Sequence, residues 1–193
     1  MVLEAGCKTK QWNYKDGIRG RYDWIASGEL LDEGVCIDTS YRNYLAPEKG
    51  NTKVECNIEY QSVRNVDAKE QTLSFDLLVT LVWSDPNIRT NIKEDEKIIL
   101  SPDAVKKIWT PDIYVWNRTT VTTVDRWASL IQSRIFRNEK ATNVELQYEI
   151  KTTVYCMFEY SKYPMDSQNC SVKLGSTSKG AIFTLSDYGH YHH

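Results

Sequence analysis

The stretch Asn143–Cys156, NVELQYEIKTTVYC, alternates apolar and polar residues. Val144, Leu146, Tyr148 and Ile150 would lie on one face, and glutamate, glutamine and lysine side chains on the other. Successive residues of a strand point to opposite faces, so this period of two predicts a strand with one buried and one wet face. The stretch therefore indicates a protein built from half-buried strands.

Two further stretches repeat the pattern. Lys53–Val63, KVECNIEYQSV, places Val54, Cys56, Ile58 and Tyr60 on one face. Leu73–Trp83, LSFDLLVTLVW, lines up a still more continuous apolar face, and a short strand is expected over Cys170–Leu174. Strands with one wet face are typical of antiparallel sheets packed face to face. The fold class predicted is all-β, an antiparallel β-sandwich of the immunoglobulin-like type.

Helical signals are few. In Ser101–Trp109, SPDAVKKIW, serine suits the N-cap, proline the first helical position and the lysines the C-terminal end. Gly28–Gly34, GELLDEG, is expected to form part of a short N-terminal helix. The chain is divided into an N-terminal extension, residues 1–45, and a β-sandwich domain, residues 46–193.

Composition bounds the class of protein. Apolar residues make up 41% of the 193 residues and charged residues 26%, which is typical of a globular chain with enough apolar side chains for a core. No run approaches the roughly 20 apolar residues of a membrane span. The net charge of −2, with both signs mixed along the chain, argues against nucleic acid as a partner.

The chain has five cysteines, and an odd number leaves at least one outside any intrachain disulfide. Cys56 lies on an apolar strand face and is expected to be a buried thiol. Cys7 and Cys36 could pair with Cys56 or with each other, and the sequence leaves this open. Asn117 and Asn169 begin N-x-S/T glycosylation sequons, which together with the cysteines favour a secreted protein.

The loop Cys156–Cys170, CMFEYSKYPMDSQNC, joins the long strand to the short one. Pro164 fixes φ and removes a backbone donor, so the loop contains a shaped turn. A disulfide between the two cysteines would stabilise the fold by about 3 kcal/mol in the chain-entropy model. By pattern alone this loop is a hairpin closed by a disulfide, with no further role implied.

Four short motifs occur in a fixed order. Val66-Asp67-Ala68-Lys69 precedes a strand that ends in Trp83-Ser84-Asp85; Trp109-Thr110-Pro111-Asp112 follows the short helix; Tyr163-Pro164-Met165-Asp166 lies between the paired cysteines. In this combination the chain resembles, over roughly residues 50–180, the extracellular ligand-binding domain of the Cys-loop receptors, the pentameric neurotransmitter-gated ion channels.

The resemblance implies a small-molecule site between neighbouring subunits, lined by aromatic side chains. Its principal side would use Trp116, Thr177 and Lys179; its complementary side would use Trp83, Gln147, Glu145 and Arg134. Nicotinic members have a tryptophan where this chain has Thr177, which offers no π face, and Lys179 would repel an ammonium group. A simple amine ligand is therefore disfavoured, and a ligand with a carboxylate is open.

The resemblance also implies how binding would reach a channel. The coupling residues would be Tyr163, Pro164, Met165 and Asp166 of the loop, with Asp67 and Lys69 of the facing turn. Partners would be like subunits in a homo- or hetero-pentamer and a membrane domain, at the extracellular face of the plasma membrane. The chain ends 23 residues after Cys170, so we expect the family's capping hairpin and last strand to be missing from it.

Simpler alternatives remain at each point. Trp83 is in phase with an apolar strand face and could belong to the core. For Trp116, a ligand-site position and a core position are equally compatible with the sequence. The domain could be a soluble secreted binder of the same fold, like acetylcholine-binding protein, or an unrelated secreted adhesion or lectin-like module. We expect no enzyme, cofactor or metal site, because the three histidines, His190, His192 and His193, all lie at the tail and no Gly-rich phosphate loop occurs.

Overall fold

The computed structural model describes residues 8–13, 21–26, 28–32, 34–48, 52–90, 92, 96–119, 130–138 and 141–185. Its elements, in chain order, are β1 (Lys8–Asn13), β2 (Arg21–Ala26), β3 (Glu29–Asp32), β4 (Val35–Ile37), β5 (Thr52–Asp67), β6 (Thr72–Ser84), β7 (Ile88–Thr90), β8 (Lys97–Ile99), α1 (Pro102–Lys107), β9 (Tyr114–Val115), β10 (Leu130–Asn138), β11 (Ala141–Tyr155), β12 (Leu174–Gly175) and β13 (Ala181–Leu185). The fold is all-β, as predicted.

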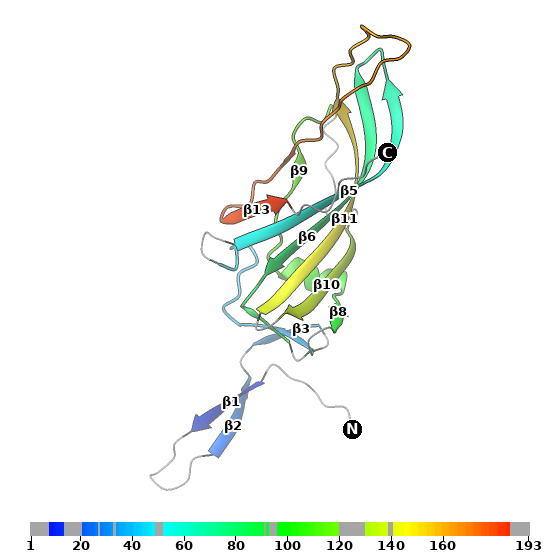
Figure 1. Cartoon of the computed structure of the whole chain (residues 1–193). Coiled ribbons are helices and arrows are strands. Elements are labelled where there is room, and N and C mark those ends of the chain that lie inside the picture. Colours follow the sequence, from blue (N-terminus) through cyan, green and yellow to red (C-terminus); the bar gives the residue numbers. More distant parts are fainter. Residues whose placement is uncertain are drawn as a thin grey trace.

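A six-stranded sheet forms the centre of the body, in the order β13-β5-β6-β11-β10-β8. All its neighbours are antiparallel except β13, which runs parallel to β5. The three stretches with period-two patterns became β5, β6 and β11, the longest strands of the chain. In Figure 1 the hairpin between β5 and β6 extends to one end of the molecule, beside the loop that follows β11.

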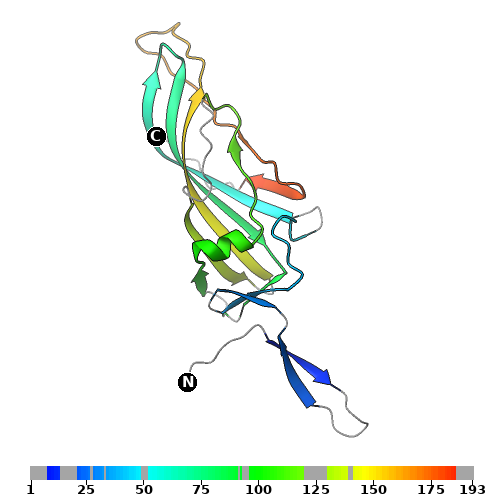
Figure 2. The ribbon, with the colours of Figure 1, turned by 180° about the vertical axis from the view of Figure 1, so that it is seen from behind.

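The second layer covers one face of this sheet. It consists of the small sheet β9-β12 and α1, which Figure 2 shows lying across the central strands. The small sheet β3-β4-β7 lies at the end of the central sheet nearest to β1 and β2, where Leu31, Val35, Ile37 and Ile88 join the core. The alternating apolar side chains of β6 and β11 face this layer and form the core: Phe75, Leu77, Val79, Leu81 and Trp83 of β6 with Val144, Leu146, Tyr148, Ile150 and Val154 of β11. The arrangement is the predicted sandwich.

Helix α1 forms where its caps predict it. Ser101 is the N-cap, and its side-chain oxygen accepts a hydrogen bond from the amide of Ala104 at 3.3 Å. Ala104 and Val105 face the core. No helix in the described part of the chain is long and apolar enough to cross a membrane.

Two local predictions were wrong. The helix expected over Gly28–Gly34 does not form, because Leu31 enters the core as part of strand β3 and Gly34, at φ +73°, makes the turn into β4. Glycine takes such a left-handed conformation without strain, so this segment closes a hairpin instead of continuing a helix. The strand expected over Cys170–Leu174 is reduced to β12, Leu174–Gly175, since the backbone before it is held by side-chain bonds instead.

One residue of a predicted face also departs from it. Tyr60 of β5 is exposed although Val54 and Cys56, in the same phase, are buried. The pairing of β5 with β6 shifts register between Tyr60 and Ser62 and again between Val63 and Asn65. Both shifts follow Tyr60, which itself still pairs in register with the buried Leu77, so they do not account for its exposure. Beyond Tyr60 such bulges change which face a side chain occupies, and the outer half of β5 does not continue the buried stripe.

Candidate functional site

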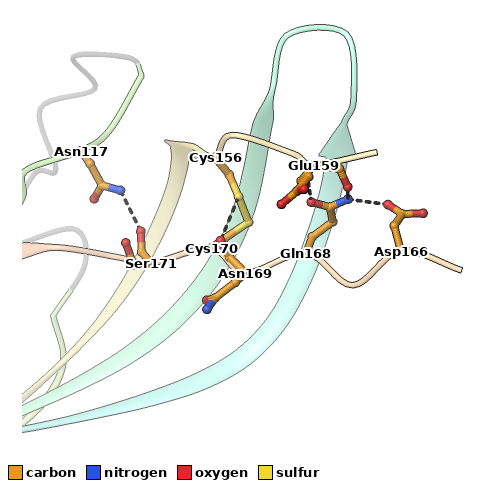
Figure 3. Close-up of a disulfide and its surroundings, with 8 residues drawn as sticks. All are labelled: Asn117, Cys156, Glu159, Asp166, Gln168, Asn169, Cys170 and Ser171. Carbon is orange, nitrogen blue, oxygen red and sulfur yellow. Dashed lines mark hydrogen bonds between the residues drawn. A yellow bond between two sulfur atoms is a disulfide. The ribbon is translucent and has the colours of Figure 1, made fainter. Parts of the chain in front are cut away.

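The cysteines at the ends of the 156–170 loop form the predicted disulfide, with their Cα atoms 5.4 Å apart. Figure 3 shows Gln168 beside it, bridging the two arms of the loop. The Gln168 side chain donates to the Glu159 carbonyl at 2.9 Å and accepts from the Glu159 amide at 2.8 Å, and it also contacts Asp166. The disulfide and this amide bridge together fix the base of the loop.

The loop contacts the turn between β5 and β6. The Cys156 amide donates to the Gln71 carbonyl at 2.8 Å, and the Tyr160 hydroxyl donates to the Ala68 carbonyl at 3.3 Å. Asp67 shapes this turn, because its carboxylate accepts from the amides of Lys69 and Glu70, both at 3.0 Å. The two segments expected to act together are therefore in contact.

The tip of the loop is apolar and exposed. Met165 is 87% exposed and Tyr163 76%; Met157, next to Cys156, and Val66, near the end of β5, are exposed as well. Pro164 forms part of the turn between them, with a cis Tyr163–Pro164 peptide. Contiguous exposed apolar side chains usually mark an interaction site.

A different surface gathers around β9. Trp116 directly follows β9 and is 70% exposed, and its ring lies 6.0 Å from that of Tyr114. In the β9–β12 pair Gly175 stands opposite Tyr114, and the Trp116 amide donates to the Lys173 carbonyl at 2.7 Å. Alternation along β9 puts both aromatic side chains on one face. Trp116 is therefore not a core residue, and its place in a ligand site stays a prediction.

Thr177 lies at the other end of this surface. Its hydroxyl donates to the Asp112 carboxylate at 3.5 Å, and the Asp112 amide donates to the Ser178 hydroxyl at 2.6 Å. Tyr114, Trp116 and Thr177 thus come from two segments that the β9–β12 pairing joins. Sequence reasoning missed Tyr114, although its position two residues before Trp116 would have revealed it. Lys179, predicted for the same ligand surface as Trp116, instead lines a separate hollow with Asp38 and Arg42.

The opposite part of the central sheet carries a row of polar side chains. In the β10–β11 register Arg134 stands opposite Glu145, and Gln132 opposite Gln147. The Glu145 carboxylate lies 3.5 Å from Arg134 and 3.5 Å from Lys97 of β8. Arg134 is held further by Gln132 and remains partly exposed. Three predicted complementary-side residues, Arg134, Glu145 and Gln147, therefore share one surface.

Trp83 does not belong to that surface. It is 2% exposed, and its ring meets the ring of Trp109 edge-on at 5.7 Å. This burial favours the core alternative for Trp83, which ends the continuous apolar face of β6. A contact between Trp83 and ligand stays a prediction.

A buried polar network supports the segment that leads to β9. The Tyr41 hydroxyl donates to the Asp85 carboxylate at 2.7 Å and accepts from the Trp109 amide at 2.9 Å. Burial raises the pKa of Asp85, and the donors from Tyr41 and Asn87 partly oppose this rise. Burial also raises the pKa of Tyr41, so its hydroxyl keeps its proton. The network joins loop 38–48, the end of β6 and the segment before β9.

The remaining cysteines and the sequons have different surroundings. Cys36 is disulfide-bonded, Cys7 lies outside the described residues, and Cys56 is a thiol whose pKa is raised by burial. Asn169 is exposed, whereas the side chain of Asn117 makes two hydrogen bonds: its Nδ2 donates to the Ser171 carbonyl at 2.7 Å, and its Oδ1 accepts from the Lys173 backbone amide at 2.9 Å. The three tail histidines also lie outside the described residues.

Comparisons with known proteins agree with this geometry. The family model of the neurotransmitter-gated ion-channel ligand binding domain matches residues 33–181. The human (Homo sapiens) gamma-aminobutyric acid receptor subunit rho-2 is 24% identical over 123 residues, which are 64% of this chain and 26% of the relative. The Rattus norvegicus rho-2 subunit matches to the same extent, so the chain spans only part of the length of these relatives. Because the family model covers most of it, the chain belongs to the neurotransmitter-gated ion-channel ligand-binding domain family.

Proposed function

We propose that the chain is the extracellular ligand-binding domain of a pentameric ligand-gated ion channel. A small ligand would bind between subunits, and the 156–170 loop with the 67–71 turn would pass the change to a membrane domain. The observation that carries this proposal is the contact between these two segments below an exposed apolar tip. A ligand can shift a ring between two geometries only by binding one of them better.

The interfacial position is supported by where the two polar and aromatic surfaces lie. The β9–β12 surface and the β8–β10 edge are at opposite sides of the body in both Figure 1 and Figure 2. Trp116 and Tyr114 of one subunit would then face Arg134 and Gln147 of the next around a closed ring. Head-to-tail contacts of this kind close into rings when the rotation fits.

The ligand class follows from the chemistry of the two surfaces. The aromatic faces of Trp116 and Tyr114 attract an ammonium group, by about 0.5–2 kcal/mol depending on desolvation. The Arg134 guanidinium offers donors that suit a carboxylate. We therefore propose a small zwitterion, the class to which gamma-aminobutyric acid belongs, and not a simple amine.

A second candidate is a soluble binding protein of the same fold, without a channel. The apolar tip disfavours it, because a protein without a partner at this end gains nothing from exposing Met165, Tyr163 and Met157 to water. An adhesion or lectin-like module is disfavoured further by the family membership.

Light scattering of the purified chain tests assembly, and we expect a species with five times the mass of the 22.4 kDa chain. Titration with gamma-aminobutyric acid, followed by tryptophan fluorescence, tests the site. Arg134→Gln and Trp116→Ala should each weaken binding, whereas Lys162→Gln, a loop lysine far from both surfaces, should not. A single-chain mass at high concentration, with no saturable ligand response, would contradict the proposal.

A further inference from the structure

A hollow on the body lies apart from both ligand surfaces, with a volume of about 580 Å³. It is formed by three segments distant in sequence: the loop between β4 and β5, Asn87 in the turn after β6, and the Lys179–Gly180 turn before β13. The Thr52 amide donates to the Gly180 carbonyl at 3.0 Å, which fixes that turn beside the start of β5. Small-molecule sites typically occupy volumes of this order.

The hollow combines an apolar lining with cationic groups. Leu45, Ala46 and Pro47 supply aliphatic surface, and Tyr41 supplies a ring. Ala46 and Tyr41 pack against the core, so this side of the hollow rests on the folded body. Tyr41 is in addition held by Asp85 and the Trp109 amide, which fixes its position.

The acidic residue of the hollow has charged and polar partners, whereas its two basic residues, Lys179 and Arg42, have no acidic partner among the described residues. Asp38, its acidic residue, is occupied: its carboxylate accepts from the amide and hydroxyl of Ser40 at 2.9 and 2.8 Å and pairs with Arg89 at 3.2 Å. Arg42 donates to the Tyr44 hydroxyl at 2.6 Å and keeps its charge. Among the described residues, no acidic group pairs with Lys179 or Arg42. The net field in the hollow is therefore positive.

From this arrangement we propose that the hollow is a second ligand site, within one subunit, for a small monocarboxylate with an apolar body. Lys179 and Arg42 would hold the carboxylate, and Leu45, Pro47 and the Tyr41 ring would cover the apolar part. Charge-assisted hydrogen bonds orient the ligand, and the aliphatic lining selects against purely inorganic anions. This site does not depend on the interfacial site proposed above, because none of its residues lies on the Trp116 surface or the Arg134 surface.

The site also has a route to the principal surface. Lys179 is two residues beyond Thr177, whose hydroxyl bonds to Asp112, and Tyr41 bonds to the Trp109 amide. A ligand that orders the Lys179 turn would therefore act on both segments that carry Tyr114, Trp116 and Thr177.

Benzoate is the probe, with benzamide as its uncharged counterpart of the same shape and sulfate as an anion without an apolar body. Titrations of the full ¹⁵N-labelled chain should show saturable benzoate shifts at the amides of Arg42, Ala46 and Gly180. Benzamide and sulfate should each bind about tenfold more weakly, the loss expected for one missing charge or apolar contact set.

Lys179→Gln and Arg42→Gln should each reduce benzoate affinity about tenfold. Lys162→Gln removes the same charge from the distant loop and should leave it unchanged. Trp116→Ala should also leave benzoate binding intact, which separates this site from the interfacial one. Equal binding of benzamide or sulfate, absence of saturable shifts, or shifts confined to the Trp116 surface would each overturn the proposal.

Discussion

The ring of Tyr114 lies directly over Gly175: a Cβ atom at position 175 would come within 2.8 Å of Tyr114 Cζ and 2.9 Å of its hydroxyl oxygen. Real Cβ atoms do not approach other atoms so closely, so only glycine leaves room for the ring in its present place. The bare backbone at Gly175 thus leaves room for Tyr114, whose ring lies 6.0 Å from that of Trp116.

Gly175→Ala should therefore displace Tyr114 and destabilise the fold by about 1–3 kcal/mol, the usual cost of overpacking. Urea unfolding measures the effect, and the assigned indole N–H signal of Trp116 in a ¹⁵N spectrum reports the displacement. In a Tyr114→Ala background the same alanine meets no ring, so its cost should largely disappear. An equal cost in both backgrounds would show that Tyr114 is not the group that Gly175 accommodates.

Replacing both Cys156 and Cys170 by serine should lower the free energy of unfolding by about 3 kcal/mol, because the loop regains its freedom in the unfolded chain. The double substitution leaves no lone thiol at this position. Urea unfolding under non-reducing conditions measures the loss, and mass spectrometry of the parent protein should find both sulfurs oxidised. Two free thiols in folded protein would disprove the disulfide.

Trp83→Ala and Trp116→Ala should have opposite effects. Trp83 is buried against Trp109, so its loss should cost about 3–5 kcal/mol of stability. Trp116 is mostly exposed, so its removal should change stability little and weaken ligand binding instead. Urea unfolding and ligand titration of both variants make the comparison. A Trp83 variant of unchanged stability with weakened ligand binding would show that Trp83 contacts the ligand.

The Tyr41–Asp85 bond should give a pH-dependent mutational effect. The pKa of Asp85 is raised above its ordinary value of 3.8, so the folded state binds this proton more tightly than the unfolded state does. Its contribution to stability is therefore fully present below pH 3.8 and is lost as pH rises through the raised pKa. Tyr41→Phe removes a donor to the carboxylate and raises this pKa further.

The cost of Tyr41→Phe should accordingly be about 1–3 kcal/mol at neutral pH, where the carboxylate loses a donor, and smaller near the ordinary pKa of the group. Urea unfolding at several pH values between these limits measures it. Tyr44→Phe, at an exposed tyrosine of the same loop, is the matched control. A cost that does not vary with pH would mean that Asp85 does not titrate in this range.

Glycan attachment should distinguish the two sequons. Asn169 is exposed, and Figure 3 shows its side chain directed away from the disulfide, whereas the Asn117 amide is used in two hydrogen bonds to the backbone after Cys170. In a glycosylating host we expect modification at Asn169 and little at Asn117. Glycopeptide mass spectrometry decides it, and full occupancy of Asn117 would contradict the hydrogen-bonded arrangement.

The sequence by itself determined the parts of the fold that repeat at short range. The period of two in the stretches that became β5, β6 and β11 predicts their buried faces, and Ser101 and Pro102 predict where α1 begins. The paired cysteines around Pro164, with the Trp109–Asp112 motif, indicated the family. Each of these signals is local, because strand alternation and helix capping depend on neighbours a few residues apart.

Only the tertiary structure decided what long-range packing controls. Trp83 is buried against Trp109, and the ring of Tyr114 lies over Gly175. Gly28–Gly34 belongs to a hairpin and not to a helix. Lys179 lines a hollow with Asp38 and Arg42. For Trp83, Tyr114 and Lys179 the partner lies far away in the sequence, whereas the β3–β4 hairpin forms because Leu31 packs into the core. The alternation put Trp83 in phase with the apolar face of β6, but whether that face is covered depends on the layer packed over it, which is built from distant segments.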